Sequence, residues 1–147
     1  MNTVQTRSRE ETIALGESFA RSLSPGTVVG LIGNLGSGKT QLVIGICRGL
    51  GVESRVASPT FTLINEYAAP AASVIHVDLY RIGSRAELAE LGIEEYFNNR
   101  CICLVEWAER MRDLLPGDAQ IVTIAYGADP SERVFTFGET ASGGGGL

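Results

Sequence analysis

The chain has 147 residues and a mass of 15.6 kDa, which is the size of one domain. Hydrophobic residues make up 44% and charged residues 20%, and this composition excludes a wholly disordered chain. Twelve basic against seventeen acidic residues leave a net charge of −5, so strong direct binding of nucleic acid through a basic patch is not expected. Among the basic residues, Lys39 is the only lysine.

The sequence carries no signal for a membrane or for secretion. No window approaches 18 continuous apolar residues, and residues 1–11 are polar and mixed in charge. Cys47, Cys101 and Cys103 lie in apolar runs, where cysteine usually behaves as a small buried hydrophobe. A metal–thiolate site is not favoured, since His76 is the only histidine. We therefore expect a protein of the reducing cytoplasm, with no membrane association.

In chain order, the first third predicts a helix, a strand and a second helix. Residues 8–11 have the Ser-x-x-Glu form of a capping box, which predicts a helix over about 9–23. The apolar run at 27–32 predicts a buried strand. A glycine-rich loop follows over 33–38, and residues 39–50 then predict a helix.

The middle third predicts strands with one further helix. Strands are expected at 55–57, 61–67 and 74–78. A second capping box begins a helix over about 84–91, and the apolar run at 101–106 predicts another strand. These segments continue the alternation of strands and helices.

The last third predicts a helix over 107–115 and two antiparallel strands, at 121–126 and 133–137. The glycine-rich residues 138–147 are expected to be a disordered tail behind one domain that spans 1–137. The whole pattern predicts an α/β fold whose mixed, mostly parallel sheet carries helices on both faces.

The loop between the first predicted strand and its helix fits the phosphate-binding pattern Gly-x-x-x-x-Gly-Lys-Ser/Thr, known as the P-loop or Walker A motif. Its residues are Gly33, Asn34, Leu35, Gly36, Ser37, Gly38, Lys39 and Thr40. Glycines allow successive backbone N–H groups to face a phosphate, and the helix adds the positive end of its dipole. Lys39 would reach the β- and γ-phosphates and Thr40 would bind Mg²⁺.

Two predicted strands end in a carboxylate, as the metal of a P-loop requires. Asp78 ends one strand and Glu106 the other; one would hold Mg²⁺ while the other positions the attacking water or responds to it. We interpret His76 as a packed or hydrogen-bonded histidine rather than a catalytic base. Trp107, directly after Glu106, is either a core residue or an aromatic side chain linked to the nucleotide.

Three functions compete at this point. A GTPase is excluded, because its guanine-binding Asn-Lys-x-Asp would need a second lysine. A small-molecule kinase stays open, although the chain offers little length for an acceptor-binding insertion and a lid; its second phosphate could be clamped by Arg81, Arg85, Arg110 and Arg112. A nucleotide-gated interaction module also stays open, because a P-loop ATPase that needs a partner would look the same in isolation.

The ordered set of motifs resembles the TsaE family over roughly residues 8–137. The motifs are Gly-Asn-Leu-Gly-Ser-Gly-Lys-Thr (33–40), Ser-Pro-Thr-Phe-Thr-Leu-Ile-Asn-Glu-Tyr (58–67), His-Val-Asp-Leu-Tyr-Arg (76–81), Glu-Leu-Gly-Ile-Glu-Glu-Tyr-Phe (90–97) and Leu-Val-Glu-Trp (104–107). The resemblance implies a P-loop fold, ATP and Mg²⁺ as cofactors, and weak ATPase activity. It also implies action on a complex of the proteins TsaB and TsaD during threonylcarbamoyladenosine modification of tRNA, by a chain that is monomeric in isolation.

The resemblance also assigns roles to single residues. Lys39 and Thr40 match the nucleotide and Mg²⁺ residues, Asp78 a functional aspartate, and Glu106 with Trp107 a Glu-Trp pair. The loop from Ser58 to Thr60 matches a switch near the γ-phosphate. The chain departs from the family at Asn34, which replaces Asp, and at Ala108, which replaces Pro. Residues near the N-terminal helix and Arg133 are the candidates for contacts with adenine.

Overall fold

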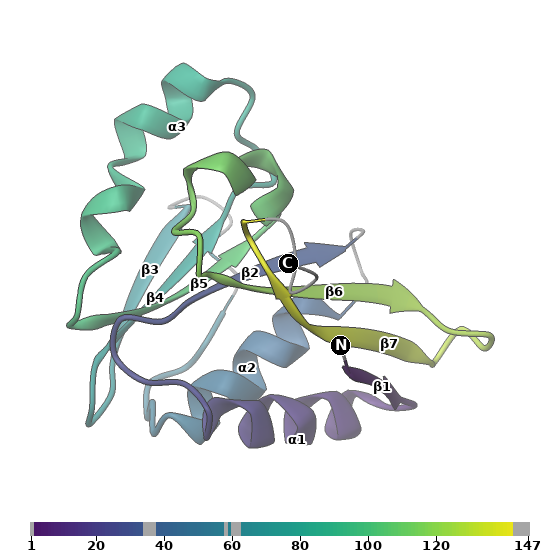
Figure 1. Ribbon diagram of the computed structural model, residues 1–147. Coiled ribbons are helices and arrows are strands. Elements are labelled where there is room, and N and C mark those ends of the chain that lie inside the picture. The colour runs from purple at the N-terminus through teal and green to yellow at the C-terminus, as the bar shows by residue number, and fades with distance from the viewer. Residues whose placement is uncertain (1, 34–37, 58, 60–62, 143–147) are drawn as a thin grey trace.

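The structure is a computed structural model that describes residues 2–33, 38–57, 59 and 63–142. Its centre is a sheet whose described strands follow the order β1-β7-β6-β2-β5-β4-β3 (Figure 1). The strands are β1 (Asn2–Thr6), β2 (Val28–Gly33), β3 (Ile64–Ala68), β4 (Ser73–Asp78), β5 (Cys101–Glu106), β6 (Gln120–Tyr126) and β7 (Arg133–Thr140). The α-helices are α1 (Arg9–Ala20), α2 (Lys39–Gly49) and α3 (Arg85–Leu91), and the 3₁₀ helices are η1 (Ile93–Tyr96), η2 (Ala108–Arg110) and η3 (Arg112–Leu114).

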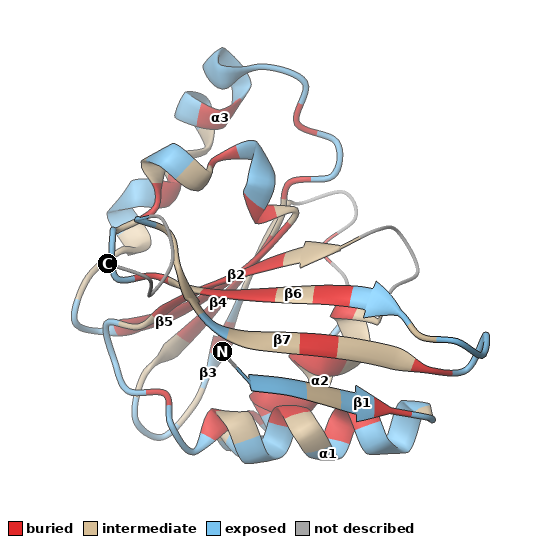
Figure 2. Cartoon of the chain, turned by 45° about the vertical axis from the view of Figure 1, so that its right-hand side comes forward, coloured by how far each residue is buried: buried red, intermediate tan, exposed pale blue. Residues whose placement is uncertain are grey.

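The sheet is mixed, as the sequence predicts. Its centre is parallel, since β6, β2, β5 and β4 pair in one direction. The strands β7 and β3 run antiparallel to their neighbours, and β1 pairs antiparallel with β7. The central strands are continuously apolar and buried on both sides (Figure 2), as expected for parallel strands covered by two layers.

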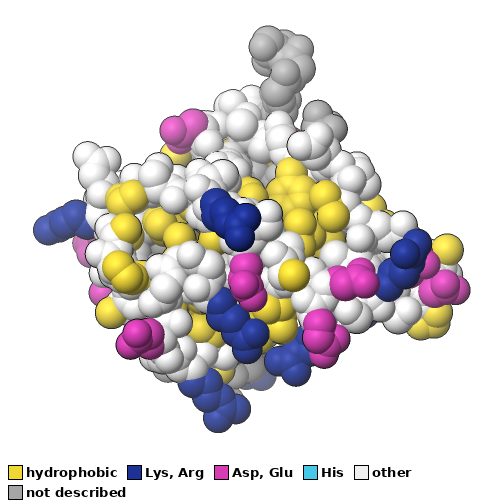
Figure 3. Space-filling view, turned by 90° about the horizontal axis from the view of Figure 1, so that it is seen from below, with side chains coloured by type: hydrophobic (Ala, Val, Ile, Leu, Met, Phe, Trp, Pro, Cys, Tyr) yellow, Lys and Arg dark blue, Asp and Glu magenta, His cyan; other side chains and the backbone are white. Residues whose placement is uncertain are grey.

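Helices cover both faces of this sheet. The helices α1 and α2 lie on one face, and α3 with the 3₁₀ turns lies on the other (Figure 1). Each layer has its own apolar core: Leu42 and Ile46 belong to the first, Leu88 and Met111 to the second. Acidic and basic side chains are interspersed on the face seen from below, where α1 is outermost (Figure 3).

The helices α1 and α2 approach each other through glycines. A Cβ atom on Gly45 would lie 2.1 Å from the Ile13 carbonyl oxygen, and one on Gly16 would lie 2.5 Å from the Leu42 carbonyl oxygen. No side chain fits at those distances, so the backbones are in direct contact. This contact fixes the position of α1 relative to the first turn of α2.

The serine of each predicted capping box caps its helix. The Ser8 hydroxyl accepts a hydrogen bond from the Glu11 N–H at 3.1 Å, and Ser84 accepts one from the Glu87 N–H at 3.2 Å. Such caps satisfy N–H groups that a helix start leaves without a partner. The helix α1 ends at Ala20, three residues before the predicted end at 23. Within the described part of the chain, no helix is long and apolar enough to cross a membrane.

Several predicted elements are wrong. Residues 55–57 form no strand, because Ala57 bonds instead to the Tyr67 hydroxyl and the Asn65 side chain. Residues 107–115 form two 3₁₀ turns rather than one helix, since Trp107 has a left-handed backbone with φ 59°. The strand β3 begins only at Ile64; of the predicted strand, residues 61 and 62 lie outside the described range.

The two ends of the chain also differ from expectation. The strand β1 was not predicted, because its sequence Asn-Thr-Val-Gln-Thr has no apolar run. The strand β7 continues to Thr140, so the predicted tail boundary at 137 is too early. Beyond it, the Ala141 and Ser142 N–H groups donate to the carbonyls of Ala119 and Gly117. Residues 143–147 of the predicted tail lie outside the described range.

Candidate functional site

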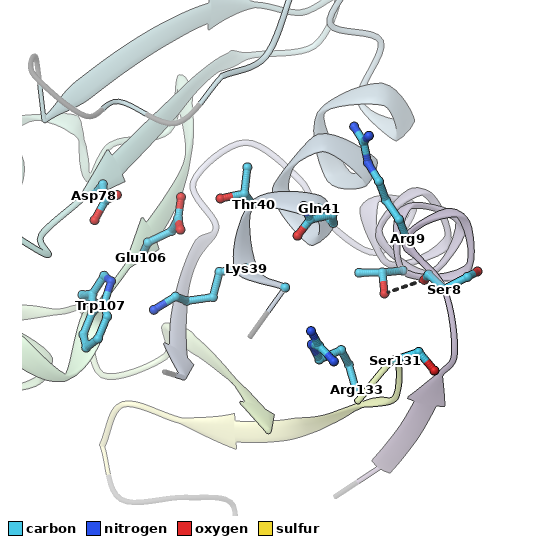
Figure 4. A pocket seen from close by; sticks show the side chains of 12 residues that line it. Ser8, Arg9, Lys39, Thr40, Gln41, Asp78, Glu106, Trp107, Ser131 and Arg133 are labelled. Carbon is cyan, nitrogen blue, oxygen red and sulfur yellow. Dashed lines mark hydrogen bonds between the residues drawn. The ribbon is translucent and has the colours of Figure 1, made fainter. Parts of the chain in front are cut away.

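A pocket of about 370 Å³ lies where β2 gives way to α2. Figure 4 shows its side chains on two sides of the start of α2. We call one side the carboxylate side, formed by Lys39, Thr40, Asp78, Glu106 and Trp107. We call the other the arginine side, formed by Ser8, Arg9, Ser131 and Arg133. Thr12, Gly38 and Gln41 also line the pocket.

Parallel pairing brings the carboxylate side together. The strand β5 lies between β2 and β4 and runs parallel to both, so all three strands end at the same edge of the sheet. Asp78 and Glu106 are the last residues of β4 and β5 and are direct partners in the ladder. The loop that carries the Walker A pattern leaves β2 at this edge. Asp78, Glu106 and Lys39 therefore line the same pocket.

Lys39 is almost fully buried, with 4% of its surface exposed. Its ammonium donates a hydrogen bond to the Gly33 carbonyl at 2.6 Å and lies 3.7 Å from the centre of the Trp107 ring. Burial lowers the pKa of Lys39, and the nearby carboxylates of Glu106, Glu109 and Asp78 oppose that shift. The Gly33 carbonyl and the face of the Trp107 ring thus stabilise the ammonium in this structure. A bound phosphate would offer it charged oxygens instead.

The Trp107 ring is held from several directions. Its residue has φ 59°, a left-handed conformation that is uncommon outside glycine and typical of functional sites. The Tyr80 ring lies 5.1 Å away, centre to centre, and the Arg110 guanidinium 5.6 Å away. The ring packs against the core of the second layer and also lines the pocket. The link of Trp107 to the nucleotide stays a prediction.

The two carboxylates differ in their surroundings. Glu106 is 3% exposed, and one of its oxygens, Oε2, lies 2.5 Å from His76 Nε2. Asp78 is partly exposed and accepts a hydrogen bond from the Tyr80 N–H at 2.9 Å. His76 is completely buried and hydrogen-bonded, as the sequence predicts. Glu106 is thus the more deeply buried of the two acids.

The arginine side depends on β1. Pairing of β1 with β7 sets Thr6 opposite Arg133, and Ser8 follows as the residue that caps α1. Arg133 donates hydrogen bonds to the carbonyls of Pro130 and Glu132, at 2.7 and 2.9 Å. Its guanidinium also lies 4.5 Å from the centre of the Tyr126 ring. The two regions in which adenine contacts were sought therefore line one pocket.

Other predicted site residues have different outcomes. The structural positions of Asn34, Leu35, Gly36, Ser37 and Thr60 lie outside the described range. The four arginines considered for a kinase, Arg81, Arg85, Arg110 and Arg112, are not among the described residues that line the pocket. Arg85 and Arg112 pair instead with Asp113, at 2.9 Å, and Glu139, at 2.5 Å.

The donor atoms of the carboxylate side fit Mg²⁺. No three His, Cys, Asp or Glu side chains gather as a metal cluster among the described residues. Mg²⁺ does not require such a cage, since it takes one or two carboxylates together with waters and phosphate oxygens. A hydroxyl at Thr40 and carboxylates at Asp78 and Glu106 are hard oxygen donors of this kind.

A central parallel strand, the loop at its carboxyl end, the following helix and the neighbouring strand-end acids define an α/β protein of the P-loop NTPase type. Comparison with known proteins narrows this class. The sequence profile described as "Threonylcarbamoyl adenosine biosynthesis protein TsaE" matches residues 6–134. The chain belongs to the TsaE family.

Individual relatives agree with that assignment. The chain is 41% identical to the Bacillus subtilis tRNA threonylcarbamoyladenosine biosynthesis protein TsaE over 90% of its length and 83% of that protein. It is 40% identical to the Haemophilus influenzae protein of the same name, over 78% and 75% of the two chains. The crystal structure of Bacillus subtilis YdiB superposes with a TM-score of 0.78, at 35% identity, over 92% of this chain and 83% of that one.

Proposed function

We propose that this chain binds ATP with Mg²⁺, hydrolyses it weakly, and acts in this way in threonylcarbamoyladenosine modification of tRNA. The observation that carries the proposal is the convergence of Lys39, Thr40, Asp78 and Glu106 on one pocket at the start of α2. The names of the relatives, which place those proteins in this biosynthesis, support the biological role.

Each residue of the carboxylate side has a task in this proposal. Mg²⁺ would neutralise charge on the β- and γ-phosphate oxygens. Glu106 would hold it as the buried carboxylate of the pocket, and Thr40 would hold it through a hydroxyl that lines the pocket at the first turn of α2. Lys39 would exchange the Gly33 carbonyl for phosphate oxygens. Asp78, which is more open to solvent, would orient the attacking water or transmit the state of the nucleotide.

The nucleoside would lie on the arginine side. The first turn of α2 presents Gly38, Lys39, Thr40 and Gln41 to the pocket, and its N–H groups favour phosphate. With the terminal phosphates toward Lys39, the remaining space leads to Arg9 and Arg133. A guanidinium plane can stack on a base, and Arg133 is held by two carbonyls in a fixed orientation.

Turnover would be controlled by partner proteins, the TsaB–TsaD complex. A net charge of −5 disfavours a protein that binds tRNA by itself, and in the complex the partners would hold the RNA. The three cysteines are free, which suits the reducing cytoplasm where this pathway would operate. In isolation the chain would be a monomer with slow hydrolysis.

A hydrolysis assay with and without the TsaB–TsaD pair tests this function. Phosphate release from ATP should be slow for the isolated chain, faster with the pair, and dependent on Mg²⁺. A screen for phosphorylated small-molecule acceptors serves as the control for the kinase alternative. Transfer of the γ-phosphate to such an acceptor, or hydrolysis that ignores the pair, would contradict the proposal.

A second measurement assigns the metal residue. Glu106→Ala should weaken Mg²⁺-dependent nucleotide binding specifically, while Asp78→Ala should mainly slow turnover. An unchanged Mg²⁺ requirement in Glu106→Ala would transfer the metal role to Asp78.

A further inference from the structure

Glu106 is bonded to a histidine for which the proposed function gives no task. His76 is 0% exposed, and its Nε2 atom lies 2.5 Å from Glu106 Oε2. The other ring nitrogen, Nδ1, is buried and has no hydrogen-bond partner among the residues that the structure describes. A completely buried histidine with one partner, on the carboxylate that faces the pocket, is unusual if packing is its only purpose, because an apolar residue would fill the space without burying a polar atom.

The register of the sheet explains why the two side chains meet. In the parallel ladder of β4 and β5, His76 is opposite Leu104 and Asp78 is opposite Glu106. Alternate residues of a strand share a face, so His76, Asp78, Leu104 and Glu106 all point to one side of the sheet. His76 lies one step deeper than Asp78 and is the diagonal neighbour of Glu106. His76 therefore contacts the Glu106 carboxylate from the core, and the pocket lies on the opposite side of that carboxylate.

The position of the proton follows from the surroundings. With hydrogen on Nε2, the ring donates to Glu106 Oε2, and Nδ1 is left as a bare acceptor. With hydrogen on Nδ1, a buried N–H would have no acceptor in the described part of the chain, and the Nε2 lone pair would face a carboxylate oxygen. The first tautomer makes a hydrogen bond where the second makes none, so His76 is assigned as the donor.

We propose that His76 is a positioning residue for Glu106: its N–H fixes Oε2 and leaves Oε1 as the oxygen that a metal–nucleotide complex meets in the pocket. The inference rests on the proposed function in so far as Glu106 holds Mg²⁺. Removal of a residue that orients a metal-binding side chain typically lowers metal affinity or activity about 10- to 100-fold. Such a residue needs no contact with the nucleotide.

Variants of His76 test this inference through metal binding rather than through activity. His76→Leu removes the donor at similar volume, and His76→Gln keeps an N–H at a similar reach. Binding of a fluorescent ATP analogue is measured in EDTA and across a Mn²⁺ titration, with bound Mn²⁺ read by electron paramagnetic resonance. His76→Leu should raise the apparent Mn²⁺ dissociation constant about 10- to 100-fold. His76→Gln should recover most of the loss, and binding in EDTA should stay within about twofold of the wild type, because no phosphate contact changes.

A double-variant comparison separates positioning from general packing. In a Glu106→Gln background, His76→Leu should no longer change the Mn²⁺ dissociation constant, because the carboxylate it positions is gone. An unchanged constant in His76→Leu, an equal loss in EDTA, or a full effect in the Glu106→Gln background would overturn the inference while leaving the proposed function intact. Wild-type protein that binds neither ATP nor Mn²⁺–ATP would overturn both.

The wild-type protein offers a measurement that does not depend on any variant folding. Nitrogen-15 spectra of the single histidine distinguish the two tautomers, and hydrogen on Nε2 is expected. Addition of Mn²⁺-free Mg²⁺–ATP should shift the Nε2 signal more than ATP in EDTA does, because only the former engages Glu106. Hydrogen on Nδ1 with a bare Nε2, or equal shifts under both conditions, would refute the positioning role even if His76→Leu does not fold.

Discussion

The two sides of the pocket are built in different ways. The carboxylate side consists of residues at the ends of central parallel strands and at the first turn of α2, where Lys39 and Glu106 are nearly buried. The arginine side consists of residues from the start of β7, the turn before it and the start of α1, where Arg9 and Ser131 are exposed. One side is fixed by the core, the other by the docking of an edge strand and a helix.

This difference teaches how a small domain can separate two demands. Phosphate and metal contacts need fixed geometry, which central strands supply because their backbones are paired on both sides. A base can be held by a more open surface, since stacking tolerates small displacements. Changes on the carboxylate side should therefore abolish function, whereas changes on the arginine side should grade it.

The largest effect is expected at Lys39. Lys39→Met keeps a side chain of similar length against Trp107 but removes the ammonium, and should reduce partner-stimulated hydrolysis by at least about 100-fold, the scale of one preorganised donor. Burial lowers the pKa of Lys39, so the folded state holds this charge at a cost that the unfolded chain does not bear. The free energy of unfolding should therefore stay equal or rise.

Phosphate release and urea unfolding, measured on the same preparation, check both halves of this prediction. Full hydrolysis in Lys39→Met would remove the carboxylate side from the function. A marked loss of stability would instead show that the Gly33 and Trp107 contacts of the ammonium outweigh its burial.

The next effect should arise where α1 meets α2. A Cβ at Gly45 would lie 2.1 Å from the Ile13 carbonyl oxygen, so Gly45→Ala must push the helices apart. Overpacking of this kind costs about 1–3 kcal/mol, and we expect a net loss although alanine gains about 1 kcal/mol in helix propensity. The displacement of α1 should weaken ATP binding while inorganic tripolyphosphate still binds. The exposed Arg48→Ala on the same helix is the control, and equal stability in both variants would contradict the close contact.

The residues of the carboxylate side can be predicted from the sequence because they belong to short, local sequence patterns. Lys39 and Thr40 belong to a fixed motif, and Asp78 and Glu106 each end an apolar run that the structure shows as a strand. Parallel strands between helices place such ends at one edge, so a meeting of these residues follows from the order of elements. The His76 bond to Glu106 was out of reach, since it depends on the register between two strands.

For the arginine side, the sequence indicates only two candidate regions, the N-terminal helix and Arg133. The strand β1 pairs with a strand more than 120 residues later, as in Thr6 with Arg133, and its exposed sequence carries no apolar run. The left-handed backbone at Trp107 likewise has no signal in the sequence. It is the reason that two short 3₁₀ turns form where one helix was predicted. Both failures come from long-range packing that overrides local preference.

A moderate effect is expected at Arg133. Arg133→Ala should weaken ATP binding about 2- to 30-fold, since stacking on a guanidinium contributes about 0.5–2 kcal/mol and 1.4 kcal/mol is about tenfold. Tripolyphosphate, which lacks a nucleoside, should bind as tightly as before. Competition against a fluorescent ATP analogue measures both affinities, with Arg100→Ala at the amino end of β5 as the control. An equal loss for both ligands would place Arg133 at the phosphates instead.

The smallest effect should appear in thiol reactivity, which reports the two layers separately. Cys47 lies in α2 and Cys103 in the opposite core, where its thiol donates to the Tyr96 carbonyl. Burial raises the pKa of each to about 12, against 9.0 for an exposed thiol. At pH 8 both thiols should therefore react through transient opening, because the thiolate is the reactive form.

Nucleotide should slow the reaction of Cys47 more than that of Cys103, because α2 begins at the residues that we propose contact the phosphates. Paired variants that keep only one thiol, followed with a disulfide reagent, give each rate alone. The unfolded chain releases these protons first as pH rises, so their contribution to the free energy of unfolding is complete below pH 9 and is lost between about 9 and 12. Equal protection of both thiols by ATP would show that the nucleotide stabilises the whole domain. The difference between the carboxylate side and the arginine side would then be confined to the pocket itself.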